Sequence, residues 1–370
     1  MRVPILRAQV LAALLVGAGI IAGAASSAGQ SFIGNFNSVT TLGTTVPMIG
    51  DENPYGVAWV PVSRGKLIRG QFLVSNFNNS ANLQGTGTTI VEMTKDGQQS
   101  LFAQIDPSKV SCPGGIGLTT ALVALRSGYV VVGSLPTTDG MSDSAAAGCL
   151  LILDWNGDVV QTVTGHHLNG PWDMTAVDGD DYAALFVTNV LNGTVKAGGN
   201  IVKEGSVVRM LFAFPDHGSP RLLTSTVIAD DFPERTDQAA LVIGPTGVAF
   251  DNETGTLYVA DSLDNRIAGI PNALFRSDDA RAGFTVSWGG ALNDPLGLAM
   301  TPNHHLIAAN GNDGKIVEIN PRTGHQVAAK LVDSSMNGGD PGAGALFGLV
   351  ATSDGVYFVD DAVNSFDLLN

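Results

Sequence analysis

The stretch GPTGVAFDNETGTLYVADSLDNRIAGI, residues 244–270, contains two apolar strands joined by a polar turn, followed by a third apolar strand. A ribbon of this kind cannot bury both of its faces alone, so it needs similar units to pack against. Whether the chain supplies such units therefore decides the fold.

Related units begin at Asn53, Gly115, Asn169, Asn293 and Gly344. Each opens with turn residues, usually including a Gly, and continues into two apolar strands. The second strand ends at a short polar residue that can start a turn, namely Asn76, Ser134, Asn189, Asp261, Asn310 and Asp360. The last units are closely periodic, since 50 residues separate Gly247 from Gly297 and 51 separate Gly297 from Gly348. Four-stranded units of this length predict an all-β fold, a six-bladed β-propeller.

The sixth unit ends early, because the chain stops inside its third strand, at SFDLLN. Residues 37–49 precede the first unit and have strand character. We expect this N-terminal segment to supply the fourth strand of the last blade and to close the ring, which removes an unpaired sheet edge.

The motif G-P-x-G-V-A-F-D followed by L-Y-V-A-D-S-x-x-N-R-I resembles an NHL repeat. The chain as a whole is similar to the six-bladed NHL and SMP-30/gluconolactonase-like propellers, most specifically at residues 244–270, fairly at 293–319 and loosely elsewhere. The resemblance implies the same fold. It does not fix the chemistry, since these propellers include scaffolds, ligand binders, lactonases and strictosidine-synthase-like enzymes.

Residues 1–28 have the pattern of a secretory signal peptide. Arg2 and Arg7 precede an apolar run from Val10 to Ala25, and small residues suit cleavage after Ala28. The alternative is an uncleaved anchor helix, but the run is shorter than the roughly 20 residues that a membrane span needs. We expect an exported protein, periplasmic or extracellular, with a single β-propeller domain at residues 29–370 and no membrane partner after cleavage.

The chain carries a formal net charge of −15, which becomes −17 when the two signal-peptide arginines are removed. So acidic a protein repels phosphate backbones, and nucleic acid is not an expected partner. Cys112 and Cys149 lack the spacing of a zinc site. They form either a disulfide, as an oxidising compartment permits, or two buried free thiols.

Six residues at the starts of the first strands are expected to point to the mouth of the central tunnel: Tyr55, Ile116, Trp172, Thr246, Leu296 and Phe347. Tyr55 and Trp172 could stack on a sugar or another flat ligand. The alternative is that they plug the tunnel as part of the core.

Side-chain oxygens near this mouth belong to Asn53, Asn169, Asp173, Asn293 and Asp294. SMP-30-like hydrolases hold a divalent cation at the axis with Asn, Asp and Glu, and the resemblance implies a cation at the same place in this chain. Calcium needs roughly six to eight oxygen ligands, whereas this mouth is mostly apolar. No metal site is therefore predicted for a binding protein; under the hydrolase alternative, Asp173, Asn53 and Asn293 are the candidate Ca²⁺ ligands.

Three long connections share one face of the expected disc, in blades one to three: residues 75–87, 134–148 and 188–205. They either carry a binding site or are solvated loops. The pairs His166-His167 and His304-His305 lie beside turns and are expected at the surface. The sequence has no H-E-x-x-H, G-x-S-x-G or Walker motif, so no catalytic residue is identified.

These observations predict a non-catalytic propeller that binds a small molecule, a glycan or a protein. Tyr55, Trp172, Asp173, Asn53, Asn293 and Asp294 are the candidate ligand-binding residues. The alternative is a metal-dependent hydrolase or lactonase of the SMP-30 type with an atypical axial site.

Overall fold

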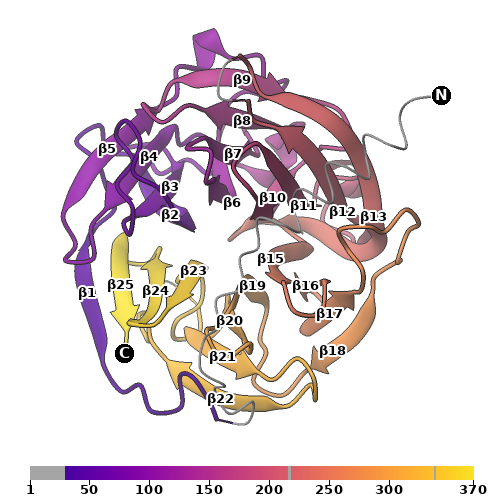
Figure 1. Ribbon diagram of the computed structural model, residues 1–370. Helices are drawn as coiled ribbons and strands as arrows, with labels where there is room; N and C mark the ends of the chain where they lie inside the picture. The colour runs from indigo at the N-terminus through magenta and orange to yellow at the C-terminus, as the bar shows by residue number, and fades with distance from the viewer. Residues whose placement is uncertain (1–29, 216–217, 337–338) are drawn as a thin grey trace.

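The computed structural model describes residues 30–215, 218–336 and 339–370, so the predicted signal peptide lies outside the described residues. Six antiparallel sheets surround a central axis as the blades of a β-propeller (Figure 1). The predicted fold is thereby confirmed. No helix in the described part of the chain is long and apolar enough to cross a membrane.

The strands follow the chain order around the ring. Blade 1 contains β2 (Glu52–Trp59), β3 (Phe72–Asn78), β4 (Thr89–Met93) and β5 (Gln99–Gln104). Blade 2 contains β6 (Leu118–Ala124), β7 (Val130–Ser134), β8 (Cys149–Leu153) and β9 (Val159–Val163). Blade 3 contains β10 (Pro171–Asp178), β11 (Tyr182–Asn189), β12 (Val202–Ala213), β13 (Arg221–Asp237) and β14 (Leu241–Ile243).

The second half repeats the arrangement. Blade 4 contains β15 (Pro245–Asp251), β16 (Thr256–Asp261), β17 (Arg266–Ile270) and β18 (Phe284–Trp288). Blade 5 contains β19 (Pro295–Met300), β20 (Leu306–Asn310), β21 (Lys315–Ile319) and β22 (Gln326–Leu331). Blade 6 contains β23 (Leu346–Thr352), β24 (Gly355–Asp360), β25 (Ser365–Leu369) and β1 (Val39–Thr44). Among the described residues, the short helical segments are α2 (Thr194–Ala197) and two 3₁₀ turns, Pro107–Lys109 and Ser142–Ser144.

The core lies between neighbouring blades. Middle strands such as β8 and β24 are buried along their whole length, as their continuous apolar sequences require. Outer strands such as β22 alternate between half-buried and exposed residues. One side of β22 therefore faces solvent.

Ring closure follows the prediction. Strand β1 pairs antiparallel with β25, from Val39 opposite Leu369 to Thr44 opposite Ser365. In Figure 1 the indigo N-terminal strand lies beside the yellow C-terminal strand. The two ends of the described chain therefore form one sheet.

The two faces of the disc differ. The links between blades and the links from second to third strands lie on one face, which we call the loop face. The turns from first to second and from third to fourth strands lie on the other, the turn face.

Blade 3 departs from the four-stranded plan, because the 17-residue β13 continues past β12 and turns back through β14. We call residues 234–243 the axial hairpin.

Cys112 and Cys149 form a disulfide with their Cα atoms 5.5 Å apart. It ties the link between blades 1 and 2 to the start of β8. The loop that this bond closes contains β6 and β7.

Residues preceding β1 are anchored to blade 5 through the buried carboxylate of Glu318. It accepts hydrogen bonds from Ser31 Oγ at 2.5 Å, Phe32 N at 2.8 Å and Ile33 N at 2.9 Å. His305 Nδ1 lies 2.6 Å from the same carboxylate. His305 is only 3% exposed, so the expectation that it lies at the surface is wrong, because this pairing draws its ring inward.

We predict that Glu318→Ala lowers the free energy of unfolding by about 3 kcal/mol, because it leaves buried donors without an acceptor. Urea unfolding measures the change. The exposed neighbouring pair His304–Glu253 provides the control, since Glu253→Ala should cost less than about 1 kcal/mol. An unchanged urea midpoint for Glu318→Ala would show that the anchor does not stabilise the fold.

Candidate functional site

Aromatic side chains close the central tunnel toward the loop face. The ring of Tyr55 stacks on Phe347 at 3.8 Å between centroids and on Phe77 at 4.4 Å. The ring centroid of Trp172 lies 6.3 Å from that of Phe347. Trp172 Nε1 donates a hydrogen bond to the carbonyl oxygen of Val242 at 3.1 Å. Tyr55 and Trp172 are each 2% exposed, so their flat faces contact core residues. We call Tyr55, Trp172 and Phe347 the aromatic plug.

The axial hairpin covers the plug on the side of blades 1 to 3. Its residues Ala240–Ile243 pack in one apolar cluster with Leu135, Val190 and Leu191 from the long connections. Gln84 Nε2 also donates to the carbonyl of Gln238 at 2.8 Å. These long connections therefore pack against the hairpin, and the open space on the loop face lies over blades 4 to 6 instead.

This space is a cavity of about 560 Å³, which we call the acidic cavity. Its apolar lining includes Ile243, Leu263, Leu296 and Phe347. Its polar side chains are Arg235, Asp237, Ser262, Asn265, Asn293, Asp294, Asn312 and Asp361. The size is within the range of small-molecule sites.

Each charged group is positioned by the end of a strand. Arg235 and Asp237 end β13 and pair with each other at 2.8 Å. Asp294 directly precedes β19, in the left-handed region with φ 55°, and its backbone N–H donates to Asn265 Oδ1 at 2.6 Å. Asp361 directly follows β24. Three carboxylates and one guanidinium thus surround one cavity.

Burial sets the charge state of two of these carboxylates. Burial and the nearby Asp237 raise the pKa of Asp294 to about 6, against the opposing effect of Arg235. Burial, with Asp360 and Glu52, holds the pKa of Asp361 well above its usual range. One buried oxygen on each, Oδ1, has no hydrogen-bond partner among the described residues. Burial therefore disfavours the ionised form of both carboxyl groups.

The structure separates the predicted site residues. Asn293 and Asp294 line the acidic cavity, and Asn53 lies at its edge, where Nδ2 donates to Asp361 Oδ2 at 3.3 Å. Tyr55 and Trp172 belong to the plug beneath it. Asp173 lines a different cavity, on the turn-face side of the plug. The candidate ligands Asp173, Asn53 and Asn293 therefore do not converge on one point.

The acidic cavity does not fit the axial cation that the resemblance implies. Within the described residues, one group of three acidic or histidine side chains has ligand atoms within 4.8 Å of one another, Asp251, Glu253 and His304. It lies on the turn face, where Glu253 is already paired with Arg322 at 3.0 Å. The carboxylates of the acidic cavity form no such group, so no chemical step is assigned to a metal.

Arg235, Asp237 and Asp361 were not among the predicted residues. Arg235 and Asp237 lie in the axial hairpin, which has no counterpart in the other units. Asp361 follows Asp360 in VYFVDD, one position beyond the repeated polar residue. The second Asp of this sequence is the feature from which Asp361 could have been predicted as a site residue.

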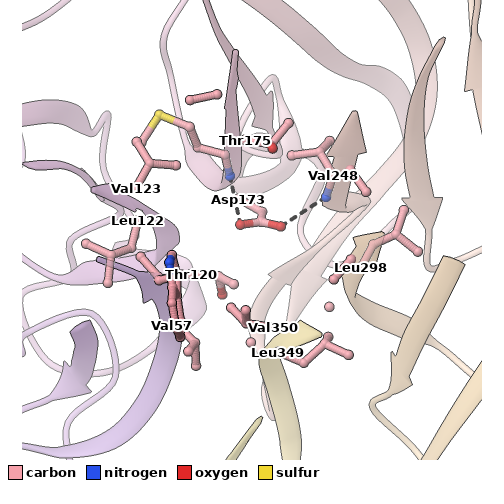
Figure 2. Close-up of a pocket in the computed structure, with 18 of the residues that line it drawn as sticks. Val57, Thr120, Leu122, Val123, Asp173, Thr175, Val248, Leu298, Leu349 and Val350 are labelled. Carbon is pink, nitrogen blue, oxygen red and sulfur yellow. Dashed lines mark hydrogen bonds between the residues drawn. The ribbon is translucent and has the colours of Figure 1, made fainter. Parts of the chain in front are cut away.

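Asp173 occupies a place where other first strands have glycine, such as Gly56, Gly247 and Gly297. A Cβ at Gly247 would lie 2.5 Å from the carbonyl oxygen of Leu296, so adjacent first strands meet backbone to backbone there. At blade 3 the Asp173 carboxylate bridges to blade 4 instead, accepting from Val248 N at 3.0 Å (Figure 2). Burial raises the pKa of Asp173 to about 7.

Solved structures with the same fold include gluconolactonases. A gluconolactonase from Xanthomonas campestris is 15% identical with a TM-score of 0.52, covering 90% of this chain and 88% of that one. A putative gluconolactonase is 16% identical with a TM-score of 0.51, covering 90% and 92%. A luciferin-regenerating enzyme is 11% identical with a TM-score of 0.50, covering 90% and 95%. The expected likeness to gluconolactonase-type six-bladed propellers is confirmed, at the level of the fold.

No protein-family model matches the sequence, and no curated protein matches it either. The likeness of residues 244–270 to an NHL repeat stays a prediction.

Another buried acid, Glu234, lies at the base of the axial hairpin. Glu234 is fully buried, and neither of its carboxyl oxygens has a hydrogen-bond partner within normal distance among the described residues. Burial, aided by Glu204, raises the pKa of Glu234 to about 9, although the nearby backbone N–H of Asn192 favours the ionised form. Glu234 is therefore neutral in the folded protein near pH 7.

We predict that Glu234→Gln makes the protein more stable at pH 8, by about 2 kcal/mol. The folded state keeps this proton up to about pH 9, whereas the unfolded chain loses it near its usual value of 4.5. The wild-type free energy of unfolding therefore falls as pH rises from 4.5 to about 9. Because the glutamine side chain does not titrate, the variant lacks this pH-dependent loss of stability. Urea unfolding at pH 4, 6 and 8 tests it, with exposed Asp278→Asn as the control. A variant less stable than wild type at pH 8 would contradict the assignment.

Proposed function

We propose that this protein is an exported β-propeller that binds a small polyhydroxylated ligand, a sugar or related glycan unit, in the acidic cavity. The observation that carries the proposal is the cavity itself, about 560 Å³, with the buried Asp294 Oδ1 and no partner for it among the described residues. Carboxylate oxygens accept hydrogen bonds from hydroxyl groups. A buried acceptor without a donor favours a ligand that supplies one.

The other surfaces of the cavity fit the same class of ligand. Arg235 and the amides of Asn265, Asn293 and Asn312 can donate to ring or hydroxyl oxygens. Leu263, Leu296 and Phe347 offer apolar contact to the C–H face of a sugar ring. Export is supported by the signal-peptide pattern of residues 1–28 and by the disulfide.

A second candidate function is hydrolysis of a lactone or similar ester in the same cavity. It is favoured by the presence of the Asp294 and Asp361 carboxyl groups in one cavity, because burial raises the pKa of both and a pair of such groups can serve as base and acid. The gluconolactonase fold is consistent with this function but does not establish it. In this candidate Asp294 would take the proton of an attacking water, and Asp361 would donate one to the leaving oxygen.

We predict that at least one member of a panel of monosaccharides, sugar acids and sugar lactones binds with one-to-one stoichiometry in calorimetry. Asp294→Ala should weaken that binding by tenfold or more, since a hydrogen bond to a charged group contributes about 1.5–3 kcal/mol. Asp278→Asn, on an exposed side chain outside the cavity, should leave it unchanged. Saturable binding that Asp294→Ala does not alter would place the ligand elsewhere.

The same panel of sugars, sugar acids and lactones distinguishes ligand binding from hydrolysis. Release of acid from the lactones, lost in both Asp294→Asn and Asp361→Asn, would establish the hydrolase. Binding without turnover would favour the binding protein. Added Ca²⁺ should change neither result, because the cavity carboxylates do not converge.

A further inference from the structure

Blade 4 carries a buried ion pair that links its second, third and fourth strands. Asp261 ends β16 and is fully buried, and Arg266, which lies opposite it, opens β17. Arg266 Nη2 lies 2.6 Å from Asp261 Oδ2, and Nη1 donates to Thr285 Oγ1 of β18 at 3.3 Å. The guanidinium therefore occupies the space between the Asp261 carboxylate and the Thr285 hydroxyl, and it offsets the charge of a buried acid.

Blade 6 keeps the buried acid but replaces the basic residue. Strand pairing places Asp360, at the end of β24, opposite Ser365, which opens β25. Ser365 thus stands where blade 4 has Arg266. Blade 5 also opens its third strand with a basic residue, Lys315, which pairs with Asp313 at 2.9 Å. Blade 6 therefore lacks the cationic side chain that accompanies the acid at this place in the two preceding blades.

A second acid lies on the same face of blade 6. Asp367 follows Ser365 by two positions, so both side chains lie on one side of β25, and Thr41 of β1 is opposite Asp367. The residue equivalent to Asp367 in blade 4 is Ala268, opposite Thr285. By this register, the space that a guanidinium fills in blade 4 is flanked in blade 6 by two carboxylates and two hydroxyl groups.

Both carboxylates have an oxygen with unused acceptor capacity. Asp360 is 4% exposed and Asp367 is 3% exposed, and the buried Oδ1 atom of each has no hydrogen-bond partner among the described residues. Asp367 Oδ2 accepts from Ser365 Oγ at 2.7 Å. Burial raises the pKa of both carboxyl groups, and the negative charge of Asp333 raises it further. Buried acids without a counter-charge are costly, so this arrangement favours a bound cation.

We propose that Asp360, Ser365 and Asp367 bind a Ca²⁺ ion, which takes the place in blade 6 that the Arg266 guanidinium has in blade 4. These donors are all oxygens, which Ca²⁺ prefers, and its flexible coordination suits ligands held by two strands. Asp333 adds negative charge from the segment after β22. It is not assigned as a ligand, because the three carboxylates do not all lie within 4.8 Å of one another. Water completes the coordination.

The ion lies in the blade that closes the ring. The face of blade 6 that carries the site packs against blade 5, since Phe358, directly opposite Asp367, shares one apolar cluster with Ile307 and Ile316. None of the proposed ligands lines the acidic cavity. The ion therefore stabilises the last blade and is separate from the site of the proposed function.

The inference is tested by thermal unfolding at pH 8, followed by circular dichroism, after dialysis against EDTA and then metal-free buffer. We expect CaCl₂ to raise the melting temperature and to bind one-to-one in calorimetry. Asp367→Asn should weaken Ca²⁺ binding by about tenfold or more. In metal-free buffer it should melt no lower than wild type, because it removes an unpaired buried charge. The exposed-acid variant Asp278→Asn and the turn-face variant Glu253→Ala should respond to Ca²⁺ as wild type does.

Ser365→Arg restores the basic residue of blade 4 and provides an independent test. It should raise the melting temperature without Ca²⁺ and remove the response to Ca²⁺, since the guanidinium replaces the ion. If Ser365→Arg does not fold, Asp367→Asn still decides. The inference is overturned if Ca²⁺ leaves the wild-type melting temperature unchanged, if MgCl₂ has an equal effect, or if either variant folds and binds Ca²⁺ as wild type does.

Discussion

The pairing of β1 with β25 is the constraint on which the rest of the structure depends. Each blade covers its faces only against its two neighbours, so an open ring would leave two apolar faces and a free edge exposed to solvent. Residues before β1 reinforce the closure, because the Glu318 carboxylate holds Ser31, Phe32 and Ile33 against blade 5. A ring closed at one blade and anchored at the next resists opening at both places.

Closure also creates the interior in which carboxyl groups are placed far from water. The polar residues that end the second strands are buried, and burial raises the pKa of Asp261 to about 6 and of Asp360 to about 7. The negative charge of Asp261 is partly offset by Arg266, whose Nη2 lies 2.6 Å from Asp261 Oδ2. Buried acids of this kind reduce the free energy of unfolding as pH rises from the unfolded value of 3.8 to the folded values of about 6 and 7, since the unfolded chain ionises first. The fold tolerates them because the inter-blade cores are large.

The same closed ring produces two unlike cavities on one axis. Backbone contacts at Gly247 and its equivalents bring the first strands together, and Tyr55, Trp172 and Phe347 fill the tunnel above them. On the loop face, the axial hairpin and the ends of β13 and β24 bring polar groups over blades 4 to 6. On the turn face, the six first strands surround a second cavity, which the carboxylate of Asp173 lines.

The sequence by itself determined the blade number, the strand pattern and the closing strand, because each depends on a local period and on the need to cover a sheet edge. It also singled out Asn293, Asp294 and Asp173 as polar residues close to the axis. Which of them share a cavity was decided only by the tertiary structure, since that depends on how far the plug fills the tunnel. The tertiary structure also decided the positions of Arg235, Asp237 and the buried His305. The axial hairpin breaks the repeat, and the pairing of His305 with Glu318 joins residues that no periodic pattern relates.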